Sequence, residues 1–179
     1  VSDIAAVRAA IDACRHPALL LVDCVSSLAC MPFDMDGWGV DIAVCGSQKG
    51  FMLNTGMAIL AVSEKALAAA ATAKLPRTFF DFRSMIDANA RGAFPYTPSL
   101  QLILGLRESL DMLFEEGLDQ VFARHNCLAQ GVRLAAAAWG MRLGANQPEL
   151  QSDTVTAIYV GDDLDANRLV EHAFNRYDL

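Results

Sequence analysis

The fold of this 179-residue chain is decided by an apolar run that ends in an acid, Ala18-Leu19-Leu20-Leu21-Val22-Asp23. The run shows no alternation of apolar and polar residues, which is typical of a strand buried on both faces of a parallel sheet. A helix is predicted just before it, because apolar residues between Ile4 and Cys14 recur at helical spacing and Ser2 or Asp3 can cap the first turn. The chain is therefore expected to start with a helix and a buried strand.

Two further apolar runs follow, at residues 40–45 and 57–62. Each has the length of a strand, and Ser63 is placed to cap an alanine-rich helix that we expect to end near Leu75, before Pro76. Helices that alternate with short buried strands indicate an α/β fold, here with a mostly parallel sheet.

The pattern changes after this helix. Residues 77–98 are irregular and rich in aromatic side chains, and a helix is predicted from Ser99 until Gly117 breaks it. A second long helix is expected to bury one apolar stripe, formed by Leu118, Val121, Leu128, Val132, Ala135 and Trp139.

The remaining elements are short. Strands are predicted within residues 141–143 and 154–160, and a last helix is expected with Asp162 as its N-cap. We expect two domains, the end of a large domain in residues 1–115 and a small α+β domain, itself incomplete, in residues 116–179.

Composition excludes several functional classes. Hydrophobic residues make up 54% of the chain, charged residues 20%, and the net charge is −7. These values are typical of a globular protein, and the acidic balance argues against nucleic acid or an anionic membrane as a partner. No apolar run reaches the roughly 18 to 20 residues of a membrane-spanning helix.

The cysteines and the N-terminus indicate the setting. Five cysteines without a CxxC pair, and three scattered histidines, fit neither a disulfide framework nor a metal site. We expect buried thiols in a reducing compartment, the cytoplasm. The start, Val1-Ser-Asp-Ile4, has neither an initiator methionine nor the features of a signal peptide, so the chain is expected to begin within a longer protein.

Two charged residues, Asp23 and Lys49, stand where neighbouring buried strands are expected to end. In open α/β sheets ligands bind at that edge, and Gly50 would let the backbone pass close to a ligand. Taken singly, Asp23 could cap a turn and Lys49 could be a solvated surface charge. Together they suit pyridoxal 5'-phosphate (PLP), which needs a nucleophilic lysine and an acid that keeps its pyridine nitrogen protonated.

Several spaced segments resemble the class V aminotransferases, and above all their serine–glyoxylate and alanine–glyoxylate branch. The segments are Leu20–Leu28, Trp38-Gly-Val-Asp41, Gly46-Ser-Gln-Lys-Gly-Phe-Met52, Phe94-Pro-Tyr-Thr-Pro98, Leu106–Leu110, Glu116–Asp119 and Val121–His125. The resemblance implies fold type I of the PLP enzymes and transamination from serine or alanine to glyoxylate. Phe94 stands where the alanine–glyoxylate branch places a tyrosine, which favours the serine–glyoxylate branch.

The resemblance also implies a role for individual residues. Lys49 would form the internal aldimine with PLP and then move protons as general base and acid. Asp23 would pair with the pyridine nitrogen, Val25 would lie against one face of the ring, and Gln48 would hydrogen-bond the phosphate region. Thr97 would reach the phosphate of a neighbouring subunit, so that a homodimer would share its active sites.

Three expectations limit this interpretation. The family often has Pro-Pro-Gly after the lysine segment, where this chain has Asn54-Thr55-Gly56. The family's phosphate-binding turn would precede Val1 and its substrate-binding arginine would follow Leu179, so this chain alone is expected to be inactive. The alternatives are a non-catalytic fragment of such an enzyme and a cysteine desulfurase, which usually has a histidine where Gln48 stands.

Overall fold

The computed structural model describes residues 1–179, and the chain divides into two compact units. The sheet unit comprises residues 3–122, and the C-terminal unit comprises residues 123–179 together with residues 1–2. Helix α5 (Leu118–Ala138) begins in the first unit and continues into the second. The expected assignment of residues 1–115 to a large domain and 116–179 to a small one stays a prediction.

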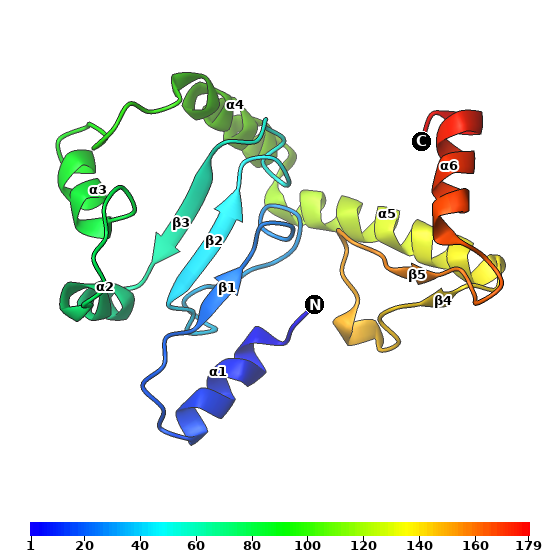
Figure 1. Ribbon diagram of the computed structural model, residues 1–179, viewed down its shortest axis with the longest axis horizontal. Helices are drawn as coiled ribbons and strands as arrows, with labels where there is room; N and C mark the ends of the chain where they lie inside the picture. The colour runs from blue at the N-terminus through cyan, green and yellow to red at the C-terminus, as the bar shows by residue number, and fades with distance from the viewer. The chain divides into compact units, whose positions relative to one another are not determined.

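The sheet unit is built on three strands, β1 (Leu21–Asp23), β2 (Ile42–Gly46) and β3 (Ala58–Val62). Strand β2 lies in the middle, parallel to β1 and antiparallel to β3 (Figure 1). In the parallel pair Leu21 lies opposite Ile42 and Asp23 lies opposite Val44. The α/β architecture is confirmed, and within this chain the sheet is mixed because its third strand runs the other way.

Two helices of the sheet unit begin where their capping residues predict. Helix α1 (Ile4–Ala13) is capped by Asp3, whose side chain accepts a hydrogen bond from the amide of Ala6. Helix α2 (Glu64–Thr72) is capped by Ser63, which accepts from the amide of Ala66. Helix α2 ends three residues before Leu75, the expected end, because the backbone is already extended at Ala73.

The core of the sheet unit consists of two apolar clusters. They are formed by Leu20, Cys24, Val40 and Ala43, and by Cys45, Phe51, Leu113 and Val121. Strand β2 contributes to both clusters, since Ala43 and Cys45 are buried. Alternate residues of a strand share one face, so one face of β2 joins the two clusters.

Strand β1 departs from the expectation of burial on both faces. Leu21 is 59% exposed, while Leu20 and Cys24 on either side of the strand are buried. The prediction that the run 18–22 is covered on both faces is therefore wrong for this chain. An unbroken apolar run makes a strand suitable for burial on both faces. Whether both faces are buried depends on other elements of the fold that pack against them.

A short helix lies within the segment that was expected to be irregular. Helix α3 (Phe82–Asn89) begins at Asp81, whose carboxylate accepts a hydrogen bond from the amide of Arg83. Helix α4 (Leu100–Glu116) follows and ends as predicted at Gly117, which has a φ of +84°. Helix α3 has only about two turns and lies in an aromatic-rich segment, so its sequence pattern was too short to predict it.

The predicted apolar stripe of α5 is largely exposed. Val121 is fully buried, but Leu128, Val132 and Trp139 are 61%, 48% and 69% exposed. Ala129 and Ala136 are buried instead. The prediction is wrong because α5 has apolar residues on two faces, and helical spacing alone does not tell which face is packed.

The C-terminal unit contains a two-stranded antiparallel sheet, β4 (Arg142–Leu143) and β5 (Ile158–Tyr159), with the 3-10 helix η1 (Pro148–Leu150) between them. Helix α6 (Ala166–Tyr177) is capped by Asp165, which accepts from the amide of Asn167, and not by Asp162 as predicted. Three acids lie close together before α6, and only Asp165 directly precedes its first turn. None of the helices is both long and apolar enough to cross a membrane.

Candidate cofactor site

The two charged residues singled out in the sequence lie at one edge of the sheet. Asp23 is the last residue of β1, and Lys49 lies in the turn three residues after β2 ends at Gly46. Because β1 and β2 are parallel, their carboxyl ends meet at the same edge. Both side chains are exposed there, as a ligand-binding role requires.

A close backbone contact holds the two turns of this edge together. A Cβ atom added at Gly50 would lie 2.2 Å from the carbonyl oxygen of Leu28 and 3.1 Å from the Cβ of Ala29. Only glycine allows the turn after β2 to approach the turn after β1 so closely. The glycine next to Lys49 therefore serves the packing of these two turns.

Ser47 closes the loop that carries Lys49. Its side chain is completely buried, donates a hydrogen bond to the carbonyl of Asn54 at 2.7 Å and accepts one from the amide of Met57 at 3.3 Å. Its backbone amide donates to the carbonyl of Met57, and its carbonyl accepts from the amide of Leu53. These bonds fix the loop without the Pro-Pro-Gly of the wider family. The sequence places Ser47 beside Gln48, but only the hydrogen bonds reveal its role.

The polar groups at the edge suit a cofactor with a basic ring nitrogen and an aldehyde. Asp23 uses Oδ1 to accept from the amide of Val25 at 2.9 Å, which leaves Oδ2 open. The Lys49 ammonium has no hydrogen bond or ion pair in the structure. Open groups of opposite charge on adjacent strand ends are what PLP requires of a protein, and the residues present fit it in this respect.

The other three predicted residues differ in their placement. Val25 is half-buried in the turn after β1, and Gln48 is exposed beside Lys49 with its side chain folded against Gly46. Thr97 is exposed in the segment between α3 and α4 and makes no hydrogen bond to the other four. The structure thus brings four predicted residues to one edge, and Thr97 lies outside the two turns that carry them.

Buried thiols lie directly behind this edge. Burial, together with the smaller effects of the nearby Cys45 and Asp23, raises the pKa of the Cys24 thiol to about 11. Burial also raises the pKa of Cys45, which is 2% exposed. Both thiols therefore stay protonated at neutral pH and act as small apolar side chains.

In the sequence, the buried acid Asp41 was named only as the last residue of the segment Trp38-Gly-Val-Asp41, without a role of its own. It is 4% exposed and accepts hydrogen bonds from the amide of Leu20 and from the side chains of Ser63 and Lys65. Burial alone would raise the pKa of Asp41, but these hydrogen bonds outweigh it and hold the pKa below its usual value. A charge at the start of a buried strand must have partners, and that rule was the signal available in the sequence.

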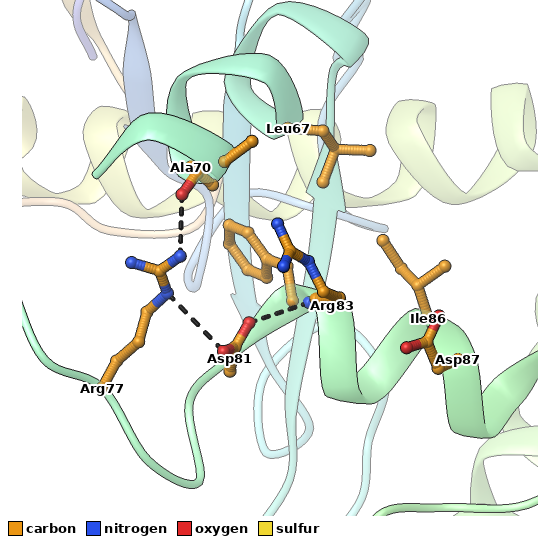
Figure 2. A pocket seen from close by; sticks show the side chains of 9 residues that line it. Leu67, Ala70, Arg77, Asp81, Arg83, Ile86 and Asp87 are labelled. Carbon is orange, nitrogen blue, oxygen red and sulfur yellow. Dashed lines mark hydrogen bonds and ion pairs between the residues drawn. The ribbon is translucent and has the colours of Figure 1, made fainter. Parts of the chain in front are cut away.

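A hollow of about 170 Å³ lies elsewhere in the sheet unit, between α2 and α3 (Figure 2). Arg77 borders it, donating a hydrogen bond to the carbonyl of Ala70 at 2.7 Å and pairing with Asp81 at 3.7 Å. None of the five predicted site residues lines this hollow. It is therefore separate from the edge that carries Asp23 and Lys49.

Comparison with known families shows to which family the chain belongs. The sequence model of the family "Aminotransferase class-V" matches residues 1–171, nearly the whole chain. The chain belongs to the class V aminotransferases. The resemblance stated from the sequence is thereby confirmed.

Individual relatives are similar to this chain over almost its full length. An L-aspartate–glyoxylate aminotransferase from Paracoccus denitrificans is 58% identical, and a serine–glyoxylate aminotransferase from Hyphomicrobium methylovorum is 55% identical. Each alignment covers 99% of this chain but only 45% and 44% of the relative. The class V chain described here thus spans about half the length of the curated relatives it matches.

A solved structure supports the same assignment. The pyridoxamine–pyruvate aminotransferase from Mesorhizobium loti superposes with a TM-score of 0.90 at 33% identity, over 99% of this chain and 45% of that protein. The expected fold type I of the PLP enzymes is confirmed by this likeness and by others of the same kind.

Proposed function

We propose that this class V chain forms part of a PLP-dependent aminotransferase that transfers an amino group to glyoxylate. The observation that carries the proposal is the pairing of Asp23 and Lys49 at one edge of two parallel strands. Both are open to a ligand, and the relatives at 58% and 55% identity are named as glyoxylate aminotransferases.

PLP, when bound, supplies an aldehyde that combines with amines and a ring that withdraws electrons from the substrate's α-carbon. Lys49 would hold the cofactor through Nζ and then move a proton between the substrate carbon and the cofactor carbon.

Asp23 would keep the pyridine nitrogen protonated through its open Oδ2. The bond from the amide of Val25 to Oδ1 fixes the direction of the carboxylate, and Val25 itself would lie against the ring. Gln48 would donate its amide to the phosphate region from the same turn as Lys49. These roles use only groups that stand at one edge of the sheet.

The amino donor is proposed to be serine, with alanine as the other donor expected from the sequence. The relative at 58% identity is named for aspartate, which makes aspartate a third candidate. The three donors differ in side-chain charge and size, so comparing the kcat/KM values of the full-length enzyme with each donor separates them.

Assembly and location belong to the same proposal. Thr97 is exposed and lies outside the turns that carry the other predicted residues, which is compatible with a residue that serves a neighbouring subunit. We therefore keep the homodimer with shared active sites as the proposed assembly. The five cysteines are all free, which fits the reducing conditions of the cytoplasm.

The proposal is tested by trapping the cofactor. The full-length protein is mixed with PLP, reduced with borohydride and mapped by mass spectrometry, and the adduct is expected on Lys49. In Lys49→Ala the adduct should disappear and kcat should fall by about 10²- to 10⁴-fold or more, the usual effect of losing a proton-transferring group.

The matched control is Lys74→Ala, because Lys74 is an exposed lysine without an ion pair in the same unit. This variant should keep both the adduct and the activity. An adduct that persists in Lys49→Ala would contradict the site assignment. Absence of any adduct in the folded wild-type protein would leave a non-catalytic member of the class V family.

A further inference from the structure

A buried acid joins four segments at the opposite end of β1 and β2 from the candidate site. The carboxylate of Asp41 accepts from the amide of Leu20 at 2.8 Å and from Lys65 Nζ at 3.1 Å, both through Oδ2, and from Ser63 Oγ at 3.2 Å through Oδ1. Arg8 of α1 approaches Oδ2 to 3.8 Å. We call Asp41 and these four partners the Asp41 cluster.

The Asp41 cluster also ties the backbone at the start of the strands. The amides of Asp41 and Ile42 both donate to the carbonyl of Leu20, at 2.9 and 3.1 Å. The amide of Ser63 donates to the carbonyl of Asp41 at 2.8 Å, and Lys65 Nζ reaches the carbonyl of Ala18 at 3.3 Å. The Asp41 carboxylate and these backbone bonds together fix where β1, β2 and α2 begin relative to each other.

Strand β1 depends on these bonds because it is only three residues long. Few ladder hydrogen bonds set its register, and at its far end the amide of Cys24 bonds the carbonyl of Val44 at 2.8 Å. A slip by one residue moves a strand by about 3.3 Å and turns every side chain to the other face. Such a slip would remove Asp23 from the edge that it shares with Lys49.

We infer that Asp41 is a positioning residue for the cofactor, acting through the register of β1 on β2. Its carboxylate lies at the other end of the two strands from Asp23 and Lys49. Asp41 holds the start of β1 in register with β2. The carboxylate of Asp23 is thereby placed level, along the strand direction, with the turn that carries Lys49. The inference rests on the proposed function, since it assigns Asp23 to the pyridine nitrogen.

The burial of the cluster supports a requirement for charge at this position. The Asp41 side chain is 6% exposed and that of Arg8 is 14% exposed, so removing the negative charge leaves Arg8, with little access to solvent, dependent on its ion pair with Asp12. Lys65 is 49% exposed and can turn to water when its partner is lost. Asp41→Asn should therefore disturb the register, and Lys65→Met should disturb it less.

The test uses the full-length protein with PLP and compares Asp41→Asn with Asp36→Asn. Asp36 is exposed and unpaired in the connection between the same two strands, so its substitution makes the same change of charge without touching the cluster. In Asp41→Asn we expect the Kd for PLP to rise about tenfold. We also expect the midpoint pH of the bound cofactor's absorption change to rise by about one unit, a tenfold change in proton affinity.

The sign of the midpoint shift follows from the charges. While Asp23 keeps the pyridine nitrogen positive, that charge repels a proton on the nitrogen joined to Lys49. If Asp23 moves away, the ring loses its charge and that proton is held more tightly, so the midpoint rises. In the protein without PLP, hydrogen exchange should show lost protection at residues 21–24 in Asp41→Asn and not in Asp36→Asn.

Each outcome decides the inference. Equal midpoints in the two variants would overturn it, including the case in which Asp41→Asn merely lowers the melting temperature. Should Asp41→Asn not fold, Lys65→Met must show a smaller shift of the same sign, and Lys65→Arg must restore the midpoint. A wild-type protein without an adduct on Lys49 would overturn the proposed function and this inference together, whereas a normal adduct with unshifted variants overturns this inference alone.

Discussion

At the scale of single residues, the candidate site depends on atoms that do no chemistry. Gly50 has no Cβ, and this allows the turn that carries Lys49 to contact the backbone of Leu28. Ser47 holds the other end of the same loop through its buried hydroxyl. The position of Lys49 is therefore set by its neighbours in sequence, and the lysine side chain itself remains free.

Gly50→Ala is expected to destabilise the sheet unit by about 1–3 kcal/mol, because the new methyl group would overlap a backbone carbonyl that can move little. Urea unfolding of the protein without PLP measures this change. The control is Gly131→Ala in α5, where an added Cβ meets nothing within 4 Å. This control should be neutral or stabilise by about 0.5–1 kcal/mol, and a Gly50→Ala variant as stable as the control would contradict the expected clash.

At the scale of elements, the Asp41 cluster explains why a three-residue strand is held in place. Its acid has a lowered pKa, so it is charged in the folded protein at a pH where the unfolded chain is already partly protonated. A carboxyl with a lowered folded pKa stabilises the fold above its unfolded pKa of 3.8 and loses that contribution as the pH falls through the folded value.

The stability difference between the wild type and Asp41→Asn should therefore depend on pH. We expect about 1–3 kcal/mol at pH 7, because the Leu20 amide and the Ser63 hydroxyl lose a charged acceptor, and a smaller difference below pH 4. Urea unfolding of the protein without PLP at pH 7, 4 and 3 gives the comparison, with Asp36→Asn as the variant that should stay close to the wild type throughout. A difference that is constant with pH would show that the charge of Asp41 is not what stabilises the strands.

The elements also show how far the sequence determines the structure. Asp3 and Ser63 predicted the starts of α1 and α2 correctly because a cap acts within one turn. The apolar face of α5 and the exposure of Leu21 were predicted wrongly, because burial depends on which neighbours are present. Asp23 and Lys49 could be paired from sequence since strand ends share an edge, whereas the contacts of Ser47 and Asp41 link residues that only folding brings together.

At the scale of the whole molecule, each compact unit has its own buried or half-buried acid that ties segments together. In the C-terminal unit this acid is Asp153, which binds Arg133 at 3.2 Å and the side-chain amide of Asn126 at 3.0 and 3.1 Å. Arg133 also donates to the carbonyl of Ser152. These contacts connect α5 to the segment before β5.

Asp153→Ala is expected to destabilise the C-terminal unit by about 1–3 kcal/mol, because the Arg133 guanidinium, 13% exposed, would lose its charged partner. Hydrogen exchange should show the loss of protection in residues 123–138 and 150–157. Asp162→Ala serves as the control, since Asp162 is exposed and makes no hydrogen bond or ion pair. Equal protection in the two variants would show that the ion pair contributes little.

The opposite placement of Asp41 and Lys49 along the same two strands has a practical consequence. The Asp41 cluster is at one end, and the groups assigned to the reaction are at the other, where the Lys49 side chain makes no bond that the fold needs. In a protein arranged in this way, the side chain of Lys49 can be replaced, and catalysis lost, without a loss of folding stability. Lys49 variants of the full-length protein should thus be well-folded traps for intact amino acids, suited to identifying the natural donor by soaking and crystallography.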